Sequence, residues 1–125
     1  MNICSYVEMI VSSVVPLRSF ASRLTNDQVV ELADMFRLLG DGSRLHIVLA
    51  CLDGPHSVGE LVAGLGLSQS LVSHHLRLLR AARLLKAERQ GKQVHYWIAD
   101  DHVRRVLVDM LAHVDEPPGG ADGEV

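Results

Sequence analysis

Cysteine is scarce in this sequence, and its scarcity argues against two kinds of site. Cys4 and Cys51 are the two cysteines, and they fall in no C-x-C or C-x-x-C pattern. This spacing disfavours both a disulfide framework and a zinc site built from thiolates. Because isolated cysteines suit a reducing compartment, we expect a cytoplasmic protein.

The sequence also lacks an apolar stretch of membrane-spanning length. Its opening segment, MNICSYVEMIVSSVVPLRSF, is largely apolar, but it has no basic start and is interrupted by Glu8 and Pro16. It fits neither a secretory signal nor a membrane span. We therefore predict no membrane partner and interpret residues 1–24 as a partly ordered N-terminal arm.

An overall basic charge is missing as well, which by itself would disfavour a nucleic-acid partner. The formal net charge is -3, but the charges are unevenly distributed. Of the 12 lysines and arginines, 6 fall between Ser68 and Trp97, where Glu88 is the one acidic residue. Such clustering indicates a local surface for phosphates within an otherwise acidic chain.

The length and composition fit one domain with a core, since the chain has 125 residues and is 48% hydrophobic. A capping box formed by Thr25 and Gln28 begins a predicted helix over Asn26–Leu39. A mostly apolar helix follows over Ser43–Leu52 and ends at a D-G-P turn. We expect this second helix to be buried.

The next segment predicts a helix-turn-helix. A capping box formed by Ser57 and Glu60 begins a short helix that ends at two glycines, and Ser68 caps the longer helix QSLVSHHLRLLRAAR. Two helices joined by a tight turn, the second polar at its start and basic further on, are typical of this motif. The residues of the second helix that we expect to face inward are Leu71, Val72, Leu76 and Leu79.

The polar start of the second helix is the candidate reading surface for DNA. We predict that Arg77 contacts phosphate and that His75 points partly toward the body of the domain. The candidates for contacts with base edges are Gln69, Ser70, Ser73 and His74.

A β-hairpin should follow the reading helix. The segment LLKAERQGKQVHYWIA predicts two strands, Leu84–Glu88 and Gln93–Ala99, joined by a turn at Gln90 and Gly91. This hairpin is a wing whose tip carries Arg89 and Lys92. We expect these two cations to contact neighbouring phosphates.

Asp100 or Asp101 should cap a last helix that continues to about Val114. The tail EPPGGADGEV is too rich in proline and glycine to be ordered. The fold class that we predict is mainly α with a β-hairpin wing, a homodimeric winged helix-turn-helix. It spans residues 25–116 and is followed by a disordered tail at 117–125.

Two histidines of the last helix are spaced so that one chain cannot bring them to the same ion. His102 and His113 are eleven residues apart, which is about 16 Å along a helix. A zinc ion needs ligand nitrogens within about 2.1 Å of itself. Two copies of the helix packed antiparallel, about a two-fold axis near Leu107 and Val108, would place His102 of one copy beside His113 of the other.

The same axis would pair Asp100 of one copy with Glu116 of the other, because the two pairs are centred within half a residue of each other. Each dimer would then hold two Asp, His, His, Glu sites. Imidazole and carboxylate ligands favour Zn(II) first and Co(II) next.

The alternative is a surface helix whose histidines and carboxylates are merely solvated. The residues that we expect to form an apolar face for the partner helix are Val103, Val106, Leu107, Met110, Leu111 and Val114.

From Val29 to Glu116 the sequence resembles the ArsR/SmtB family of winged-helix metal-sensing repressors. The similarity lies in GDGSRL, in the reading helix VSHHLRLLR, in the wing RQGKQVHYWI and in an ending of the form D-x-H with H-x-x-E. That ending is similar to the family's zinc and cobalt sensors, whose ligands lie on the C-terminal helices across the dimer. The resemblance thus implies a metal site made of Asp100, His102, His113 and Glu116.

Two departures from the family narrow the choice of metal. The arsenic, cadmium and lead sensors have cysteines where this chain has the segment Ser57–Glu60, which disfavours a thiolate site there. Nickel-sensing relatives often add histidines from the arm or the tail, but no histidine follows His113. Zinc therefore stays ahead of nickel as the expected effector.

The resemblance also implies a mechanism. A metal-free homodimer binds double-stranded operator DNA with an inverted repeat, and metal binding releases it. In relatives, a ligand histidine passes the signal to a backbone carbonyl after the reading helix, which here corresponds to His113 and the carbonyl of Arg83.

Two other interpretations stay open. A zinc enzyme would need an open coordination position for water, and four protein ligands leave none, so we expect no enzyme. A winged-helix repressor could instead sense Ni(II), or oxidation of Cys4 or Cys51, with the last helix serving only as a dimer interface.

Overall fold

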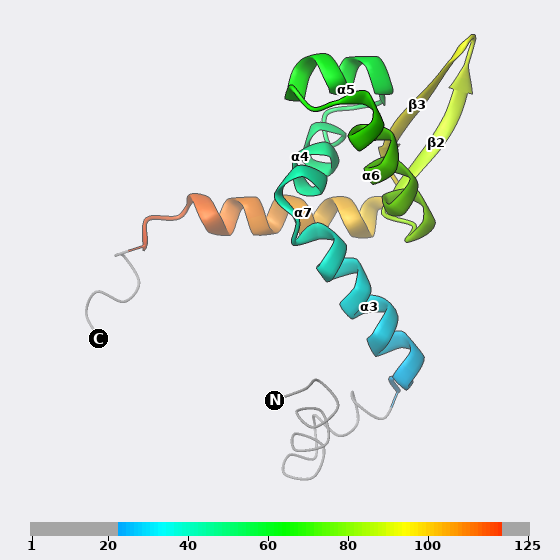
Figure 1. Cartoon of the computed structure of the whole chain (residues 1–125). Helices are drawn as coiled ribbons and strands as arrows, with labels where there is room; N and C mark the ends of the chain where they lie inside the picture. Colours follow the sequence, from blue (N-terminus) through cyan, green and yellow to red (C-terminus); the bar gives the residue numbers. More distant parts are fainter. Residues whose placement is uncertain (1–22, 119–125) are drawn as a thin grey trace. The chain divides into compact units, whose positions relative to one another are not determined.

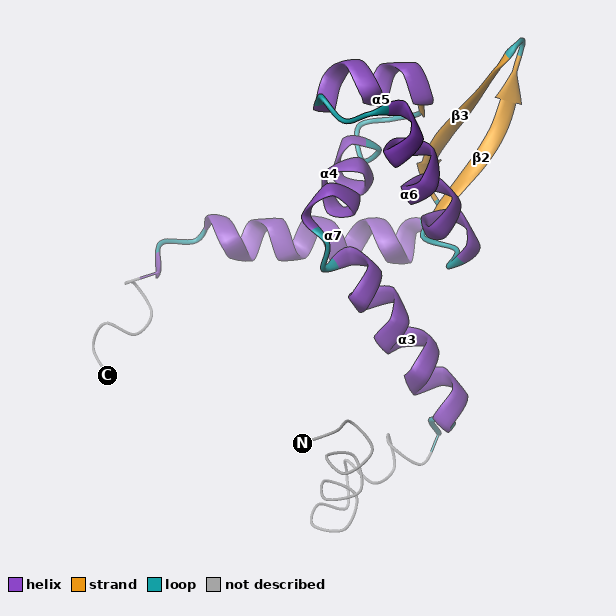
Figure 2. Cartoon of the chain, in the orientation of Figure 1, coloured by secondary structure: helices purple, strands orange, loops and turns teal. Residues whose placement is uncertain are grey.

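The structure is a computed structural model that describes residues 23–118. The chain divides into two units, Met1–Arg37 and Leu38–Val125. The predicted arm and tail lie almost entirely outside the described residues. Figure 1 shows the elements, and Figure 2 separates the helices from the β-hairpin.

Helix α3 covers Asn26–Leu39, which confirms the predicted bounds. Its start is fixed by the predicted capping box. The backbone N–H of Thr25 donates to Gln28 Oε1 at 2.9 Å, and the backbone N–H of Gln28 donates to Thr25 Oγ1 at 3.1 Å. These bonds satisfy two backbone donors that would otherwise have no partner at a helix start.

Helix α4 covers Gly42–Ala50, so it begins one residue earlier and ends two residues earlier than predicted. Asp41 sets the start, because its Oδ2 accepts from the backbone N–H of Arg44 at 3.1 Å. Ile47 and Val48 are fully buried, which confirms that α4 lies in the core.

Helices α5 (Val58–Leu65) and α6 (Gln69–Ala81) form the predicted helix-turn-helix. The capping box of α5 is present, with the backbone N–H of Ser57 donating to Glu60 Oε1 at 3.0 Å and the backbone N–H of Glu60 donating to Ser57 Oγ at 3.2 Å. Gly66 ends α5 with a φ of 72°, a left-handed conformation that glycine adopts without strain.

The sheet has three antiparallel strands in the order β1-β3-β2: β1 is His56–Ser57, β2 is Leu85–Gln90 and β3 is Gln93–Ile98. The wing exists, but its turn was misplaced by one residue, since Gln90 pairs with Gln93 and the loop is Gly91 and Lys92. Gly91 has a φ of 67° at the first loop position, where type II′ turns favour glycine. Strand β1 was not predicted, because two residues carry too short a pattern.

The core of residues 38–118 lies where α4, α5, α6 and the base of the hairpin meet (Figure 1). One inward-facing prediction on α6 is wrong, because Leu71 is 36% exposed. Val72, Leu76 and Leu79 are buried as expected, and His75 takes the remaining place on that face. The spacing explains the difference, since positions 72, 75, 76 and 79 share one face of a helix and position 71 lies about 100° away.

Helix α7 covers Asp101–Asp115, with Asp100 as its N-cap. Its one buried residue is Leu107, and every described residue from Val108 to Pro118 is exposed. Leu107 therefore faces its own chain, which corrects its assignment to the partner face. The exposed apolar residues on α7 are Val106, Val108, Met110, Leu111 and Val114.

Candidate functional site

The exposed surface of α6 carries the side chains predicted to read DNA. Ser68 begins the helix, with its Oγ accepting from the backbone N–H of Leu71 at 3.2 Å. Ser73 is half-buried, so it is less accessible than the other candidates. The exposed candidates are Gln69, Ser70, His74 and Arg77. Hydroxyl, amide, imidazole and guanidinium groups on one exposed helix surface can contact both base edges and phosphates.

The wing adds cations beside this surface. Arg89 and Lys92 are exposed near the tip of the hairpin, where Arg89 pairs with Val94 and Lys92 lies in the two-residue loop. At the base of the hairpin, the ammonium of Lys86 lies 5.2 Å from the ring centre of Trp97, directly across the strand pair. A cation–π contact at a paired position helps to hold the base in register.

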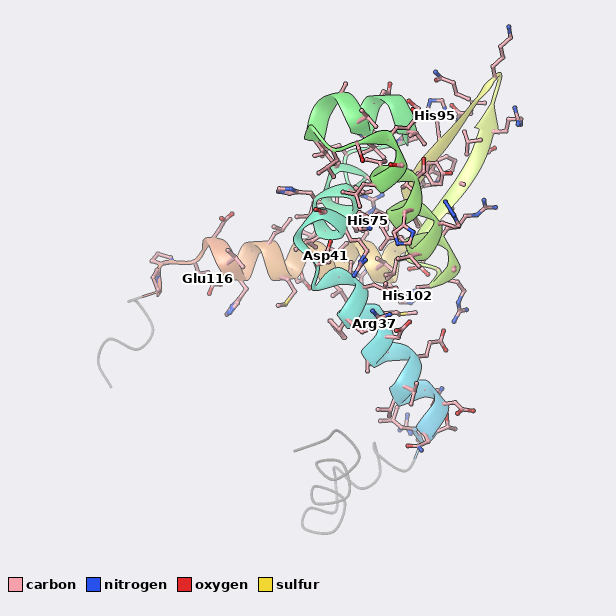
Figure 3. All side chains as sticks on the ribbon, in the orientation of Figure 1. Arg37, Asp41, His75, His95, His102 and Glu116 are labelled. Atoms are coloured by element: carbon pink, nitrogen blue, oxygen red, sulfur yellow. The ribbon has the colours of Figure 1, made fainter. Side chains whose placement is uncertain are left out.

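His75 lies on the opposite, inner side of α6, which supports the dry structural role for this residue. Its side chain is buried, and its Nε2 lies 3.8 Å from Asp41 Oδ2 (Figure 3). Its Nδ1 is buried without a hydrogen-bond partner. Burial, followed by the nearby charge of Arg44, lowers the pKa of His75 below its ordinary value, so the ring is neutral at neutral pH.

The first half of the candidate metal site is at the start of α7. Asp100 Oδ1 accepts from the backbone N–H of Val103 at 3.0 Å and lies 3.7 Å from His102 Nδ1. The hydrogen bond from Val103 holds the pKa of Asp100 below its ordinary value, so the carboxylate is charged at neutral pH. The imidazole of His102 is almost fully exposed.

The second half is in the last turn of α7, where His113 Nδ1 lies 4.0 Å from Glu116 Oε1. Both side chains are largely exposed. Figure 3 shows His102 and Glu116 toward opposite ends of the helix. Within residues 23–118, no three histidine, cysteine or acidic side chains come together as metal ligands. A single chain therefore presents two ligand pairs instead of one four-ligand site.

The two ligand pairs share one exposed side of α7. Eleven residues of α-helix amount to about three turns with a remainder of about 20°, so His102 and His113 lie on nearly the same line along the helix. Leu107, which faces the body of the chain, lies about 140° from His102 around the axis. Both pairs thus point away from the core of their own chain and are accessible to a partner.

Arg83 lies between the reading helix and the first ligand pair. It adopts a φ of 63°, and the backbone N–H of Leu84 donates to the carbonyl of Leu79 at 2.9 Å. This pattern ends α6 in a left-handed turn. The backbone N–H of Ala99, which directly precedes Asp100, donates to the carbonyl of Leu84 at 3.2 Å, so the end of the reading helix is close to that ligand pair.

Cys51 is a core residue. Its side chain is fully buried at the end of α4, and burial raises the pKa of the thiol to about 12. A thiol with so little thiolate at neutral pH is a poor sensor of oxidants. Cys4 lies outside the described residues.

Two contacts near these sites were not predicted from the sequence. The first is the cap of α4, in which Asp41 accepts from the backbone N–H of Arg44. It could have been recognised, since aspartate is favoured immediately before a helix and the G-D-G-S segment contains one. The second contact joins Arg104 of α7 to the carbonyl of Leu52, 52 residues away, at 2.6 Å. No local pattern indicates a contact over that separation.

Comparisons with known proteins agree with this arrangement. Residues 41–87 match the family described as "Bacterial regulatory protein, arsR family". A transcriptional repressor SmtB homolog from Synechocystis sp. is 39% identical over 90 residues, which cover 72% of this chain and 68% of that protein. The chain belongs to the ArsR family of bacterial regulatory proteins. It is thus a transcriptional regulator with a DNA-binding winged helix-turn-helix, not an enzyme.

Two solved structures are similar in fold to this chain. The cadmium metal-sensor CMTR from Mycobacterium tuberculosis is 41% identical, with a TM-score of 0.57 over 68% of this chain and 94% of that one. A homodimeric winged helix-turn-helix DNA-binding domain from Mycobacterium bovis is 22% identical, with a TM-score of 0.70 over 79% of this chain and 94% of that one. Among residues 23–118, none of the helices is long and apolar enough to cross a membrane.

Proposed function

We propose that this ArsR-family protein is a metal-responsive repressor whose metal-free homodimer binds an inverted-repeat operator and is released by Zn(II) or Co(II). The observation that carries the proposal is the pair of ligand pairs on the exposed side of α7, Asp100 with His102 and His113 with Glu116. A structural relative that is described as a cadmium metal-sensor supports metal sensing in general.

The proposed dimer pairs two α7 helices antiparallel. The midpoint of His102 and His113 falls between Leu107 and Val108, and the midpoint of Asp100 and Glu116 falls at Val108. One two-fold axis therefore makes two equivalent four-ligand sites. Exposed apolar side chains beside the ligands support this pairing, because an isolated chain leaves them in water. Those on the same side of α7 as the two histidines, by helix periodicity, are Val106, Met110 and Val114.

The four side chains fit a zinc ion by chemistry and by reach. Two ligands of one tetrahedral zinc lie about 3.3 Å from each other if each bond is about 2.0–2.1 Å. The nitrogen–oxygen distances of 3.7 Å and 4.0 Å within the two pairs exceed this by little, and all four side chains are exposed enough to adjust. Asp100 can cap α7 and still offer its second oxygen, since an ionised carboxylate accepts several bonds.

A bound divalent ion would supply positive charge that joins the two α7 helices across the axis. The protein's own part is to hold α6 and the wing on a rigid core, so that the angle between two copies sets the spacing of two reading surfaces. The residues that we propose for DNA contact are Gln69, Ser70, Ser73, His74, Arg77, Arg89 and Lys92. Metal and DNA would then oppose each other with a typical coupling of about 1 to 3 kcal/mol.

Arg83 is the proposed point at which the signal reaches the reading helix. In the proposed antiparallel pairing, His113 of one copy would lie beside Asp100 and His102 of the other. Within one chain, the hydrogen bond from the backbone N–H of Ala99 to the carbonyl of Leu84 holds Arg83 close to that end of α7. A ring nitrogen of His113 would donate to the carbonyl of Arg83, as ligand histidines commonly do toward a nearby acceptor. This bond would tie the metal site to the end of α6.

The test is fluorescence anisotropy of the metal-free protein on its own upstream DNA at fixed salt, followed by addition of zinc, cobalt or nickel. Wild type should be released by zinc, whereas His102→Ala should stay bound. His46→Ala is the matched control, since His46 is an exposed histidine on α4 and should leave the zinc response unchanged. Zinc-independent binding of the wild type would contradict the proposal.

A second variant tests His113, which the proposal makes both a zinc ligand and the donor to the carbonyl of Arg83. His113→Asn should bind DNA as well as wild type but lose zinc-induced release, because the asparagine lacks the second imidazole nitrogen. Zinc affinity is measured alongside by competition with a chelating dye. Release of His113→Asn at the wild-type zinc concentration would exclude the relay through Arg83.

A further inference from the structure

Arg104 differs from its neighbours on α7 because it faces the body of the chain. Its guanidinium Nη1 donates to the backbone carbonyl of Leu52 at 2.6 Å, in a partly buried contact. His102, two residues before it, and Arg105, directly after it, are exposed. Hydrogen bonds from a charged donor are shorter and roughly twice as strong as neutral ones.

The acceptor of this bond is at a specific place in the fold. Leu52 directly follows Cys51, the C-cap of α4, and the backbone N–H of Leu52 donates to the carbonyl of Leu49 at 3.1 Å. Carbonyls at the C-terminal end of a helix have no partner within the helix and carry its partial negative charge. A guanidinium is therefore well suited to this position.

The end of α4 is also where the chain leaves for the helix-turn-helix. A short turn leads from Leu52 to β1, and Ser57 then caps α5. Helix α4 packs against both α5 and α6 through a fully buried core that includes Ile47 and Val48. A displacement at Leu52 therefore reaches the DNA-reading part through side chains that have little freedom to adjust.

On α7, Arg104 lies two residues from His102, about 200° around the axis. The same turn of helix thus carries a ligand on its outer side and the guanidinium on its inner side. Any rotation or shift of α7 that accompanies ligand binding by His102 must move the donor of the bond to Leu52. This placement connects the proposed metal site to the core by one short, directional contact.

We propose that Arg104 is a positioning residue that couples α7 to the helix-turn-helix through the carbonyl of Leu52. This inference rests on the proposed metal-dependent release. Arg104 holds α4 in register with α7, so that metal-induced movement of α7 changes the placement of α6. Removing the bond should leave DNA binding and zinc binding in place but reduce the effect of one on the other.

The experiment compares Arg104→Met with the matched control Arg105→Met. Both variants lose one positive charge from the same helix turn, but only the first loses the bond to Leu52. For each, anisotropy gives the DNA affinity with and without zinc, and a chelating dye gives the zinc affinity with and without DNA. The ratio of the two affinities must be the same from either side, because coupling between binding sites is reciprocal.

For Arg104→Met we expect DNA affinity without zinc within about twofold of wild type, and a zinc-induced affinity ratio reduced by about 2- to 30-fold. Arg105→Met should retain the wild-type ratio. Arg104→Lys, which keeps a charged donor, should restore part of it. A purely stabilising role would change the unfolding midpoint without changing this ratio at temperatures where all variants are folded.

Each outcome decides between the two proposals. If wild type shows no zinc-induced change in DNA affinity, the proposed function fails, and the role of Arg104 fails with it. If wild type responds and Arg104→Met responds equally, or if both methionine variants lose the response equally, only the role of Arg104 is overturned. If Arg104→Met does not fold, Arg104→Gln replaces it against Arg105→Gln, with the same criteria.

Discussion

Helices α6 and α7 are both amphipathic, but their apolar side chains differ in burial. On α6, Val72, Leu76 and Leu79 are at most 1% exposed. On α7, Leu107 is 7% exposed, while Met110 and Val114 are 56% and 75% exposed. One chain is enough to complete the core around α6, whereas the apolar side of α7 has no covering partner among residues 23–118.

A single chain thus completes the core beneath the DNA-reading surface, but the candidate metal site would need a second chain. The surfaces proposed for DNA contact are displayed on a completed core, so their geometry does not depend on a second chain. Each of the two His–carboxylate pairs of α7 would be half of the proposed metal site, and both pairs lie on a helix with exposed apolar residues. Metal sensing would therefore depend on the dimer, whereas the shape of each DNA-reading surface depends on the fold of one chain.

The largest expected effect is on the stability of the core around α6. Leu76→Ala should lower the free energy of unfolding by about 2–5 kcal/mol, because it removes a fully buried side chain and leaves a cavity. Leu71→Ala, on the same helix but 36% exposed, should cost less than half of that. Urea unfolding measures both, and equal losses would mean that Leu71 is buried in the native protein.

The next effect concerns association through α7. Met110→Glu should raise the dimer dissociation constant by at least about tenfold, because pairing would bury an unpaired carboxylate against apolar side chains. Ala63→Glu on α5 introduces the same charge at an exposed position outside α7. Sedimentation equilibrium compares the two variants, and indistinguishable dissociation constants would remove α7 from the interface.

A smaller loss of stability is expected at the start of α5. Ser57→Ala removes the Oγ that accepts from the backbone N–H of Glu60 and should cost about 1 kcal/mol. Ser70→Ala, which changes an exposed serine inside α6, should cost less. Thermal unfolding distinguishes the two, and an unchanged midpoint for Ser57→Ala would show that the cap contributes little.

His75 should make stability depend on pH. Since folding lowers its pKa from the ordinary 6.5, the unfolded chain takes up a proton first as the pH falls below 6.5. Stability from this residue is therefore intact above pH 6.5, declines as the pH falls below that value and levels off below the lowered pKa of the folded state. The free energy of unfolding of His75→Gln should change less between neutral pH and pH 5.5 than that of wild type. Parallel profiles for the variant and wild type would assign the pH dependence to other groups.

The smallest effect is expected for Cys51, which should not react in the folded protein. In a Cys4→Ser variant, a thiol reagent at neutral pH should label Cys51 only after denaturation, because its thiol is fully buried and has a pKa of about 12. Mass spectrometry detects the adduct. Rapid labelling of the native variant would revive the thiol-sensor interpretation.

Local signals in the sequence were sufficient for most of the secondary structure. Capping boxes at Thr25 and Ser57 gave the starts of α3 and α5, because the side chains that satisfy the first backbone N–H groups are only three residues apart. The wing was predicted from two β-rich runs around Gly91, but its turn was misplaced, since register depends on which residues face the core.

The candidate sites were predictable to different degrees. Exposure of Gln69, Ser70, His74 and Arg77 followed from helical periodicity together with the buried positions of α6. The placement of His102 and His113 on one side of α7 also followed from their spacing along one helix. Whether these pairs meet in a dimer is beyond any pattern within one chain, because it depends on the fit of two surfaces.

The sequence by itself therefore determined the capped starts of α3 and α5, the presence of the wing and the helical spacing of the candidate ligands on α7, since each follows from a pattern within one segment. Only the tertiary structure decided that His75 is buried beside Asp41, that Leu107 faces its own chain and that Arg104 bonds to Leu52. Those contacts join distant segments, and they form only where packing of the whole core brings the segments together.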